Sequence, residues 1–189
     1  MSRAIPIAVF ASGSGSNFQA IAEAIEQQQL HAKIELVVTD KPDAYVIKRA
    51  ESKGIPVLAV HPKDFSSKEE YEEAILQALR EKKVEWLILA GYMRLVGHTL
   101  LQGFASRIVN IHPSLLPSFT GKDAIGQAMD HGVKITGVTV HYVDEGMDTG
   151  PIIMQKAVNV IDNNREETEA AIHAVEHDLY VAALKDILK

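Results

Sequence analysis

Two polar residues stand near the end of an apolar run that is closed by a proline. Asn110 and His112 are two positions apart in Arg107–His112, which we expect to be a β-strand ended by Pro113. Alternate residues of a strand project to the same face, so both side chains should point the same way. An amide can donate a hydrogen bond to a developing oxyanion, and an imidazole titrates near neutral pH. The pair is therefore a candidate site for acid–base chemistry, although a structural histidine fits the pattern equally well.

A glycine-rich segment, Ala11–Asn17, lies between the first apolar run and the first helical pattern. Gly13 and Gly15 let the backbone turn tightly, and the start of the following helix offers free N–H groups to an anion. Ser16 and Asn17 add side-chain donors. The segment predicts a phosphate site of the mononucleotide kind, with a purely structural turn as the alternative.

The same segment imitates the dinucleotide fingerprint G-x-G-x-x-G. Gly13 and Gly15 supply its first two glycines, and Asp40 imitates the acidic residue that holds a ribose. Phe18 occupies the third glycine position, where a small residue lets the helix pack closely on the sheet. Dinucleotide binding is therefore disfavoured, and Asp40 is interpreted as a turn or capping residue.

A third polar segment, Tyr142–Pro151, holds three acidic residues and two glycines between two expected strands. Asp148 could orient His112 or relay protons through water, with a solvated acidic loop as the alternative. Calcium is disfavoured because Asp144, Glu145 and Asp148 lack the ligand spacing of an EF-hand. The other histidines show no metal-binding spacing, so we expect no metal.

The elements that must position these residues alternate along the chain. Strands are expected at 5–11, 33–39, 56–60, 84–90 and 107–112, and helices at 17–29, 43–53, 66–82 and 164–188, the third opened by a capping-box pattern at 66–70. The segments 136–143 and 151–160 could pair as an antiparallel hairpin. This order predicts an α/β fold: a single-domain, Rossmann-like, mostly parallel sheet with helices on both faces and an antiparallel edge. Ligands of such folds bind at the carboxyl ends of strands, here after Ala11, Ala90 and Ile111.

Composition excludes several classes of function. The chain has 189 residues, with 19 Lys and Arg against 25 Asp and Glu, and no cysteine. The net charge of −6 disfavours a broad nucleic-acid or anionic-membrane surface. No apolar run approaches the ~20 residues that cross a bilayer. Without cysteine there is no disulfide and no thiolate nucleophile. We expect one domain, residues 1–189, in the cytoplasm, as a monomer or a homodimer with no nucleic-acid or membrane partner.

Five motifs together resemble those of a known family. The stretches Ser12–Asn17, Leu89–Arg94, Asn110–Pro117, Asp144–Gly150 and Glu176–His177 are similar to motifs of the phosphoribosylglycinamide formyltransferases, folate-dependent enzymes of purine synthesis. The Asn-x-His-Pro-Ser-Leu-Leu-Pro string marks the wider formyltransferase superfamily, and the likeness covers essentially the whole chain. The resemblance implies transfer of a formyl group from the cosubstrate 10-formyltetrahydrofolate to the amine of phosphoribosylglycinamide, in the biosynthesis of IMP.

The resemblance also implies a role for each site residue. The phosphate-binding half would be about 1–105, and its substrate-binding residues would be Gly13, Gly15, Ser16, Asn17 and Lys68. Glu176, on the last expected helix, would also bind the substrate, through its ribose hydroxyls. The folate-binding residues would be Met93, Arg94, Leu95, Val96, Asn110 and Asp144, with the 144–148 loop around the pterin. In the catalytic half, about 106–189, Asn110 and protonated His112 would stabilise a tetrahedral intermediate, and Asp148 would assist proton transfer.

Two residues depart from the family pattern, since Thr120 and Val181 stand where prolines are common.

Other interpretations of the function stay open. A formyltetrahydrofolate hydrolase shares the Asn/His/Asp set but has an additional N-terminal domain, whereas the first strand here is expected at about residue 5. Methionyl-tRNA formyltransferase needs a second domain and a basic surface. A non-catalytic nucleotide-binding module is disfavoured by the intact Asn/His/Asp set, and a dinucleotide oxidoreductase is disfavoured by Phe18.

Overall fold

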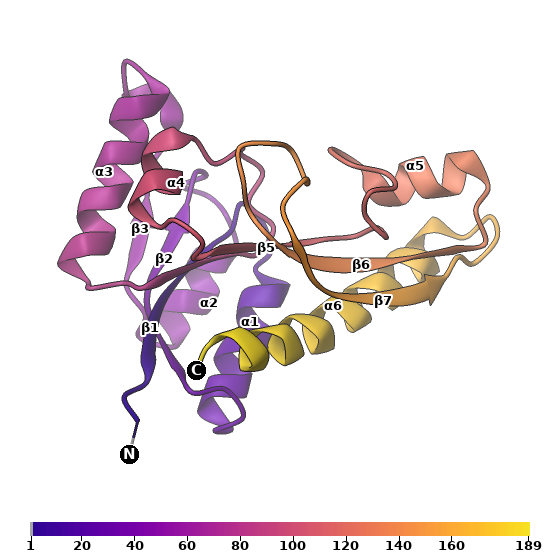
Figure 1. Ribbon diagram of the computed structural model, residues 1–189, viewed down its shortest axis with the longest axis horizontal. Helices are drawn as coiled ribbons and strands as arrows, with labels where there is room; N and C mark the ends of the chain where they lie inside the picture. The colour runs from indigo at the N-terminus through magenta and orange to yellow at the C-terminus, as the bar shows by residue number, and fades with distance from the viewer. Residues whose placement is uncertain (1) are drawn as a thin grey trace.

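A seven-stranded sheet runs through the molecule in the order β3-β2-β1-β4-β5-β6-β7 (Figure 1). The computed structural model describes residues 2–189. Neighbouring strands from β3 to β5 are parallel, whereas β6 and β7 are antiparallel to their neighbours. The predicted fold class is therefore confirmed. The strands are β1 Ile5–Phe10, β2 Ala32–Thr39, β3 Val57–Ala59, β4 Trp86–Leu89, β5 Ile108–His112, β6 Ile135–Tyr142 and β7 Ile152–Asn159.

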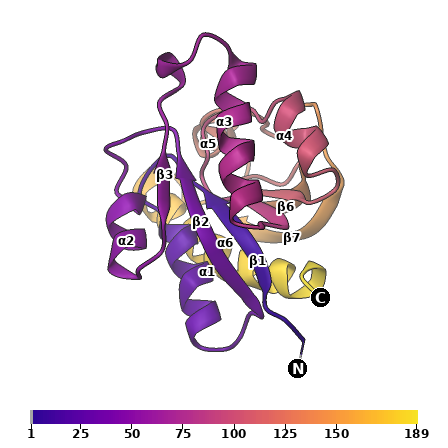
Figure 2. The same cartoon turned by 90° about the vertical axis from the view of Figure 1, so that its left-hand side faces the viewer.

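Helices cover both faces of the sheet, as Figure 2 shows for its parallel half. The helices are α1 Ser16–Glu26, α2 Val46–Ser52, α3 Lys68–Glu81, α4 His98–Gly103, α5 Ala124–His131 and α6 Arg165–Ile187, with a 3₁₀ turn at Pro62–Asp64. One hydrophobic core lies between the sheet and α1, α2 and α6, and a second lies between the sheet and α3 and α4. Both cores explain why the parallel strands are apolar almost throughout.

Side chains of each buried strand alternate between the two cores. Ile7 and Val9 of β1 pack toward α1 and α6, whereas Ala8 and Phe10 pack toward α3 and α4. On β5, Ile108 belongs to the α3–α4 core, and the same alternation carries Asn110 and His112 to that face. The common face predicted for these two polar residues follows directly from the strand.

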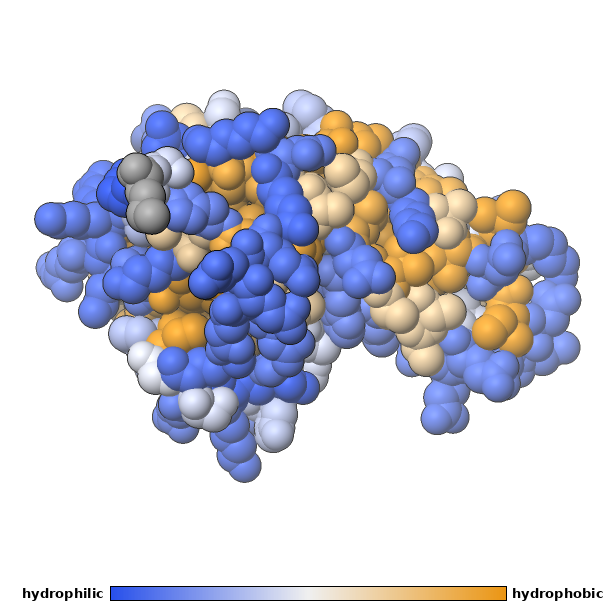
Figure 3. All heavy atoms as spheres, turned by 90° about the horizontal axis from the view of Figure 1, so that it is seen from below, coloured by the Kyte–Doolittle hydropathy of each residue, from blue (hydrophilic) through white to orange (hydrophobic). Residues whose placement is uncertain are grey.

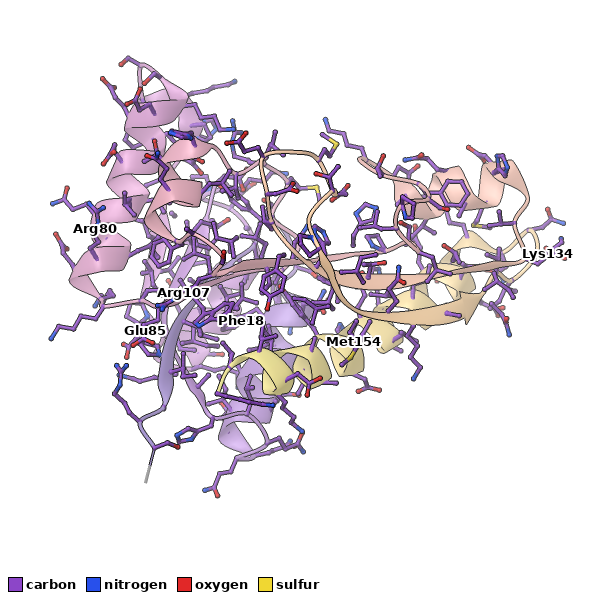
Figure 4. The ribbon with its side chains drawn as sticks, viewed as in Figure 1. Phe18, Arg80, Glu85, Arg107, Lys134 and Met154 are labelled. Carbon is purple, nitrogen blue, oxygen red and sulfur yellow. The ribbon has the colours of Figure 1, made fainter. Side chains whose placement is uncertain are left out.

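The longest helix, α6, passes beneath the sheet and packs against α1 and β7 (Figure 1). Its Tyr180 is fully buried, and the hydroxyl donates to the carbonyl oxygen of Leu89 at 2.6 Å. Figure 4 shows Phe18 of α1 between the sheet and this helix. The helix α6 therefore contacts both the carboxyl end of β4 and the helix α1.

Two helices were missed by the sequence analysis, and their shortness explains why. The helix α4 has six residues, of which only Leu100 is buried. The start of α4 depends on a tertiary contact, because Gly97 N donates to the buried carboxylate of Glu72 at 2.8 Å. The helix α5 follows Asp123, which has a φ of +51° and whose side chain accepts from Gly126 N. One half of the predicted capping box is confirmed, since Ser67 Oγ accepts from Glu70 N. The carboxylate of Glu70 accepts from the N–H of Ser66, the residue before the N-cap.

The sheet ends in β7, which forms its outer edge. The strands β6 and β7 form a hairpin. At the end of the hairpin away from its connecting loop, Lys134 before β6 and Asp162 after β7 form an ion pair of 2.7 Å (Figure 4 labels Lys134). Ile135 and Ile152 are about half exposed, and hydrophobic surface gathers on the half of the molecule built from β6, β7 and α6 (Figure 3). Among residues 2–189, no helix combines the length and the apolar character needed to span a membrane.

Candidate active site

A cavity of about 730 Å³ opens at the carboxyl ends of β1, β4 and β5. The order of the sheet reverses between β1 and β4, which is where ligands bind in open α/β folds. The loops after all three strands line the cavity, as the sequence predicted. The segment 121–125, before and in α5, lines another side. The remaining lining residues are Lys41, His141, Val143, Gly146, Met147, Asp148, Arg165, Glu169, His173 and Glu176.

The loop after β1 has the geometry of an anion site. Gly15 precedes α1 with a φ of +76°, and a Cβ there would lie 2.6 Å from the side chain of Val46. Gly13, by contrast, has nothing within 4 Å of the corresponding position. The first N–H groups of α1 have no partner within the helix, so they are available to an anion in the cavity. Ser16 and Asn17 line the same region.

Glu176 of α6 comes within reach of this loop although it lies 159 positions from Asn17. Asn17 Nδ2 donates to Glu176 Oε2 at 3.4 Å, and His173 Nδ1 lies 2.9 Å from the same oxygen. The hydrogen bond to Glu176 raises the pKa of His173. His173 was not among the predicted site residues, because an i, i+3 pair on a helix surface is common whether or not it faces a ligand.

Asp148 lies between two histidines of the cavity lining. Its Oδ2 is 3.6 Å from His112 Nδ1 and accepts from Gly121 N at 2.8 Å. Its Oδ1 is 3.8 Å from His141 Nε2. All three side chains are largely buried. The structure thus brings together the predicted His112 and Asp148 and adds two groups, His141 and the backbone of Gly121.

Hydrogen bonds orient both imidazole rings. His112 Nε2 lies 2.8 Å from the carbonyl oxygen of Phe119, which can only accept, so the proton is on Nε2 and Nδ1 faces Asp148. His141 Nδ1 likewise donates to Tyr142 O at 2.8 Å, which directs Nε2 toward Asp148. Burial lowers the pKa of His141 and favours the neutral ring. His112 and His141 therefore each turn the ring nitrogen that is not bonded to a backbone carbonyl oxygen toward Asp148.

Asn110 lies beside this cluster. It pairs with His141 across β5 and β6, and His112 pairs with Thr139 in the same register. Directly opposed residues of an antiparallel pair share a face, so the Asn110 amide and the His141 ring project together. His141 was missed because the sequence alone does not show which residue of β5 lies opposite each residue of β6, and this pairing is what brings His141 to Asn110.

The remaining predicted site residues fall into two groups. Met93, Arg94, Leu95 and Val96 line the cavity beside β4, and Met93 and Leu95 are among the most exposed large hydrophobic residues of the described chain. Lys68 and Asp144 lie outside the lining. Lys68 Nζ donates to Leu95 O at 2.7 Å, and Asp144 Oδ1 accepts from Gly146 N at 3.0 Å and Thr149 Oγ1 at 2.6 Å. These two side chains support the loops that line the cavity.

Asp40 has a role other than the predicted turn or cap. The helix α2 is capped by Tyr45 and not by Asp40. Asp40 is buried, and its Oδ1 accepts a hydrogen bond from Ser12 Oγ at 2.6 Å.

Thr120, at one of the departures from the family pattern, accepts a hydrogen bond from Gln127 Nε2 through its carbonyl oxygen. Within residues 2–189, no group of three or more His, Cys, Asp or Glu side chains is arranged to hold a metal ion.

Comparison with known proteins identifies one family and many close relatives. The model of a family described as formyl transferase matches residues 5–184. A phosphoribosylglycinamide formyltransferase of Bacillus subtilis is 53% identical over 182 residues, which are 96% of this chain and 93% of that protein. A trifunctional purine biosynthetic protein of Drosophila melanogaster is 41% identical, and there the match spans only 13% of the longer protein.

Solved structures agree with these relatives. A phosphoribosylglycinamide formyltransferase from Bacillus halodurans superposes with a TM-score of 0.95 at 52% identity, covering 97% of this chain and 95% of the other. A glycinamide ribonucleotide transformylase from Geobacillus kaustophilus gives a TM-score of 0.96 at 52% identity, covering 99% of this chain and all of the other.

Proposed function

The chain belongs to the formyl transferase family, and from this membership and the cavity described above we propose that it transfers a formyl group from 10-formyltetrahydrofolate to the amine of phosphoribosylglycinamide. The observation that carries the proposal is that one cavity joins a glycine-rich helix start, suited to a phosphate, to a buried His112–Asp148 pair. The reaction would serve purine biosynthesis. The cytoplasmic location and the choice between monomer and homodimer stay predictions.

The acceptor substrate would occupy the side of the cavity formed by α1 and α6. Its phosphate would lie against the backbone of Gly13 and Gly15 and the side chains of Ser16 and Asn17, where α1 offers N–H groups. Glu176 would accept hydrogen bonds from the ribose hydroxyls. Its carboxylate is well placed for this role because it is already held by Asn17 and His173.

The folate would occupy the side formed by the loop after β4. The exposed hydrophobic side chains of Met93 and Leu95 supply apolar surface, and the 143–151 loop between β6 and β7 rises over the sheet on the side of α3 and α4 (Figure 1). Lys68 and Asp144 would act on this side through the loops that they hold, not by lining the cavity. The Asn110 amide faces the same space.

The chemistry follows from the orientation of the polar groups. The substrate amine attacks the formyl carbon, a C–N bond forms, and the carbonyl π electrons move to oxygen. Asn110 Nδ2 and the Nδ1–H of protonated His112 would donate hydrogen bonds to that oxyanion, where such donors act mainly in the transition state. The oxyanion then re-forms the carbonyl group, and the bond between the formyl carbon and the folate nitrogen breaks with its electron pair staying on that nitrogen. The proton lost by the amine reaches that nitrogen with the help of Asp148, through water.

The first test is formyl transfer measured by the absorbance change of the folate, with and without phosphoribosylglycinamide. Turnover that depends on the ribonucleotide is the expected result. Equal turnover without the ribonucleotide would identify water as the acceptor and replace the proposal by a hydrolase. No turnover under either condition would favour a nucleotide-binding module.

The second test removes the proposed catalytic groups one at a time. Asn110→Ala, His112→Ala and Asp148→Asn should each lower kcat by ~100- to 1000-fold, the usual effect of losing one oxyanion donor or its orienting partner. His31→Ala is the matched control, because His31 is exposed, lies outside the cavity lining and should leave kcat unchanged. Near-normal rates in all three variants would refute the assignment.

A further inference from the structure

One hydroxyl group joins the two sides of the cavity. Ser12 follows β1, begins the loop assigned to the phosphate and is almost fully buried. Its backbone N–H donates to Gly91 O at 3.0 Å, and its Oγ accepts from Met93 N at 2.9 Å. Gly91 and Met93 belong to the loop after β4 that is assigned to the folate. A single residue therefore links the acceptor loop to the donor loop.

Asp40 sets the direction of this hydroxyl. A serine hydroxyl has one proton, and here it is donated to Asp40 Oδ1 at 2.6 Å, an oxygen that only accepts when ionised. The lone pairs of Oγ are then turned toward Met93 N–H. Asp40 stands directly after β2, so the carboxyl ends of three adjacent strands, β2, β1 and β4, are joined through one oxygen atom.

The surroundings of Asp40 are buried and aromatic. Asp40 is buried, and its negative charge contributes to the raised pKa of both Tyr71 and Tyr92, each of which is raised mainly by burial. The two phenol oxygens lie 2.8 Å apart. Tyr92 is the neighbour of Met93, so the donor loop is anchored in the core immediately beside the Ser12 contact.

We propose that Ser12 is a positioning residue that couples the two substrate pockets, so that occupancy of either loop strengthens binding at the other. This inference rests on the proposed function. A ligand that orders the 13–17 loop also fixes Ser12, and through Oγ it fixes Met93 before the folate arrives. Coupling of this kind is reciprocal, because each ligand must change the affinity of the other by the same factor. Asp40 supports the coupling by keeping the Ser12 hydroxyl turned toward the donor loop.

The test is a binding cycle by calorimetry with tetrahydrofolate, the product without its formyl group, and phosphoribosylglycinamide. In the wild-type protein, saturating ribonucleotide should lower the Kd of tetrahydrofolate by about fivefold or more, the lower end of ordinary allosteric coupling. Ser12→Ala should bring that ratio close to one. Ser12→Thr, which keeps the hydroxyl, should retain it. Ser52→Ala is the control, because Ser52 lies on α2 outside the cavity lining.

A second pair of variants keeps the proposal testable if Ser12→Ala fails to fold. Asp40→Ala frees the hydroxyl to rotate and should reduce the ratio, whereas Asp40→Asn keeps an accepting oxygen and should preserve it. A wild-type ratio of one, or an unchanged ratio in Ser12→Ala, would overturn the proposal. Failure of this inference can be told apart from failure of the proposed function, because in the second case the wild-type protein would show no ribonucleotide-dependent formyl transfer at all.

Discussion

Substitution by alanine should have different effects at the two glycines of the loop after β1. At Gly15 an alanine must adopt a φ of +76°, and its Cβ would lie 2.6 Å from Val46 Cγ2 and 3.0 Å from Val46 Cα. The backbone conformation costs roughly 1–2 kcal/mol for a residue other than glycine. The clash adds about 1–3 kcal/mol, because the Cα of Val46 cannot rotate away. Gly15→Ala should therefore destabilise the protein by about 3 kcal/mol.

Gly13→Ala is the matched control in the same loop. Its Cβ meets nothing within 4 Å, so the free energy of unfolding should change by less than about 0.5 kcal/mol. Because Gly13 lines the cavity where the phosphate would lie, the added methyl group should instead raise KM for phosphoribosylglycinamide. One variant is expected to lose stability and the other substrate affinity.

Urea unfolding followed by circular dichroism separates the two effects. With a slope of about 2 kcal/mol per molar urea, a loss of about 3 kcal/mol moves the midpoint down by about 1.5 M in Gly15→Ala. The midpoint of Gly13→Ala should move by less than about 0.3 M. Equal midpoints for the two variants would refute the steric argument. An unchanged KM in Gly13→Ala would remove the phosphate from this loop.

Two further predictions follow from buried and titrating groups. Tyr180→Phe removes the hydrogen bond to Leu89 O without removing the ring, so the free energy of unfolding should fall by about 1–2 kcal/mol, measured by the same urea titration; an unchanged midpoint would mean that this bond adds no net stability. The hydrogen bond to Glu176 raises the pKa of His173 in the folded protein above its value in the unfolded chain. The ion pair therefore stabilises the fold fully at a pH below the unfolded pKa, and this stabilisation is lost as the pH rises through the folded pKa. His173→Ala should accordingly be less stable than the wild type at about pH 5.5 and equally stable at about pH 9, and a difference that persists at the higher pH would contradict the assignment.

Much of the architecture could be predicted because the strands are buried on both faces. Apolar runs such as Trp86–Leu89 have few alternatives to a central parallel strand, and their order fixed the position of the cavity at the carboxyl edge. The common face of Asn110 and His112 needed only the two-residue repeat of a strand. These inferences depend on local geometry, which neighbouring residues determine.

The features that escaped prediction depend on distant contacts. Nothing in the local sequence links Asp40 to Ser12, 28 positions away, or turns the His141 ring toward Asp148. The helix α4 forms because Glu72 holds Gly97, which is again a contact between separate elements. Lys68 was predicted to bind substrate, but its ammonium group donates to the carbonyl oxygen of Leu95 and the side chain does not line the cavity. The partner of such a long side chain also depends on a distant contact.

The pairing of Asn17 with Glu176 has a consequence for the order in which the protein becomes able to bind its substrates. A ribosome releases the chain from its amino end, so the glycine-rich loop, β4 and the His112 strand all leave the exit tunnel well before α6 does. Until α6 has emerged and packed against α1, the Glu176 carboxylate proposed for the ribose and the Tyr180 hydrogen bond to the end of β4 are both missing. On the proposed function, binding of the ribonucleotide would thus become possible only after α6 has left the ribosome. A ribonucleotide bound in this way would then oppose the separation of α1 from α6.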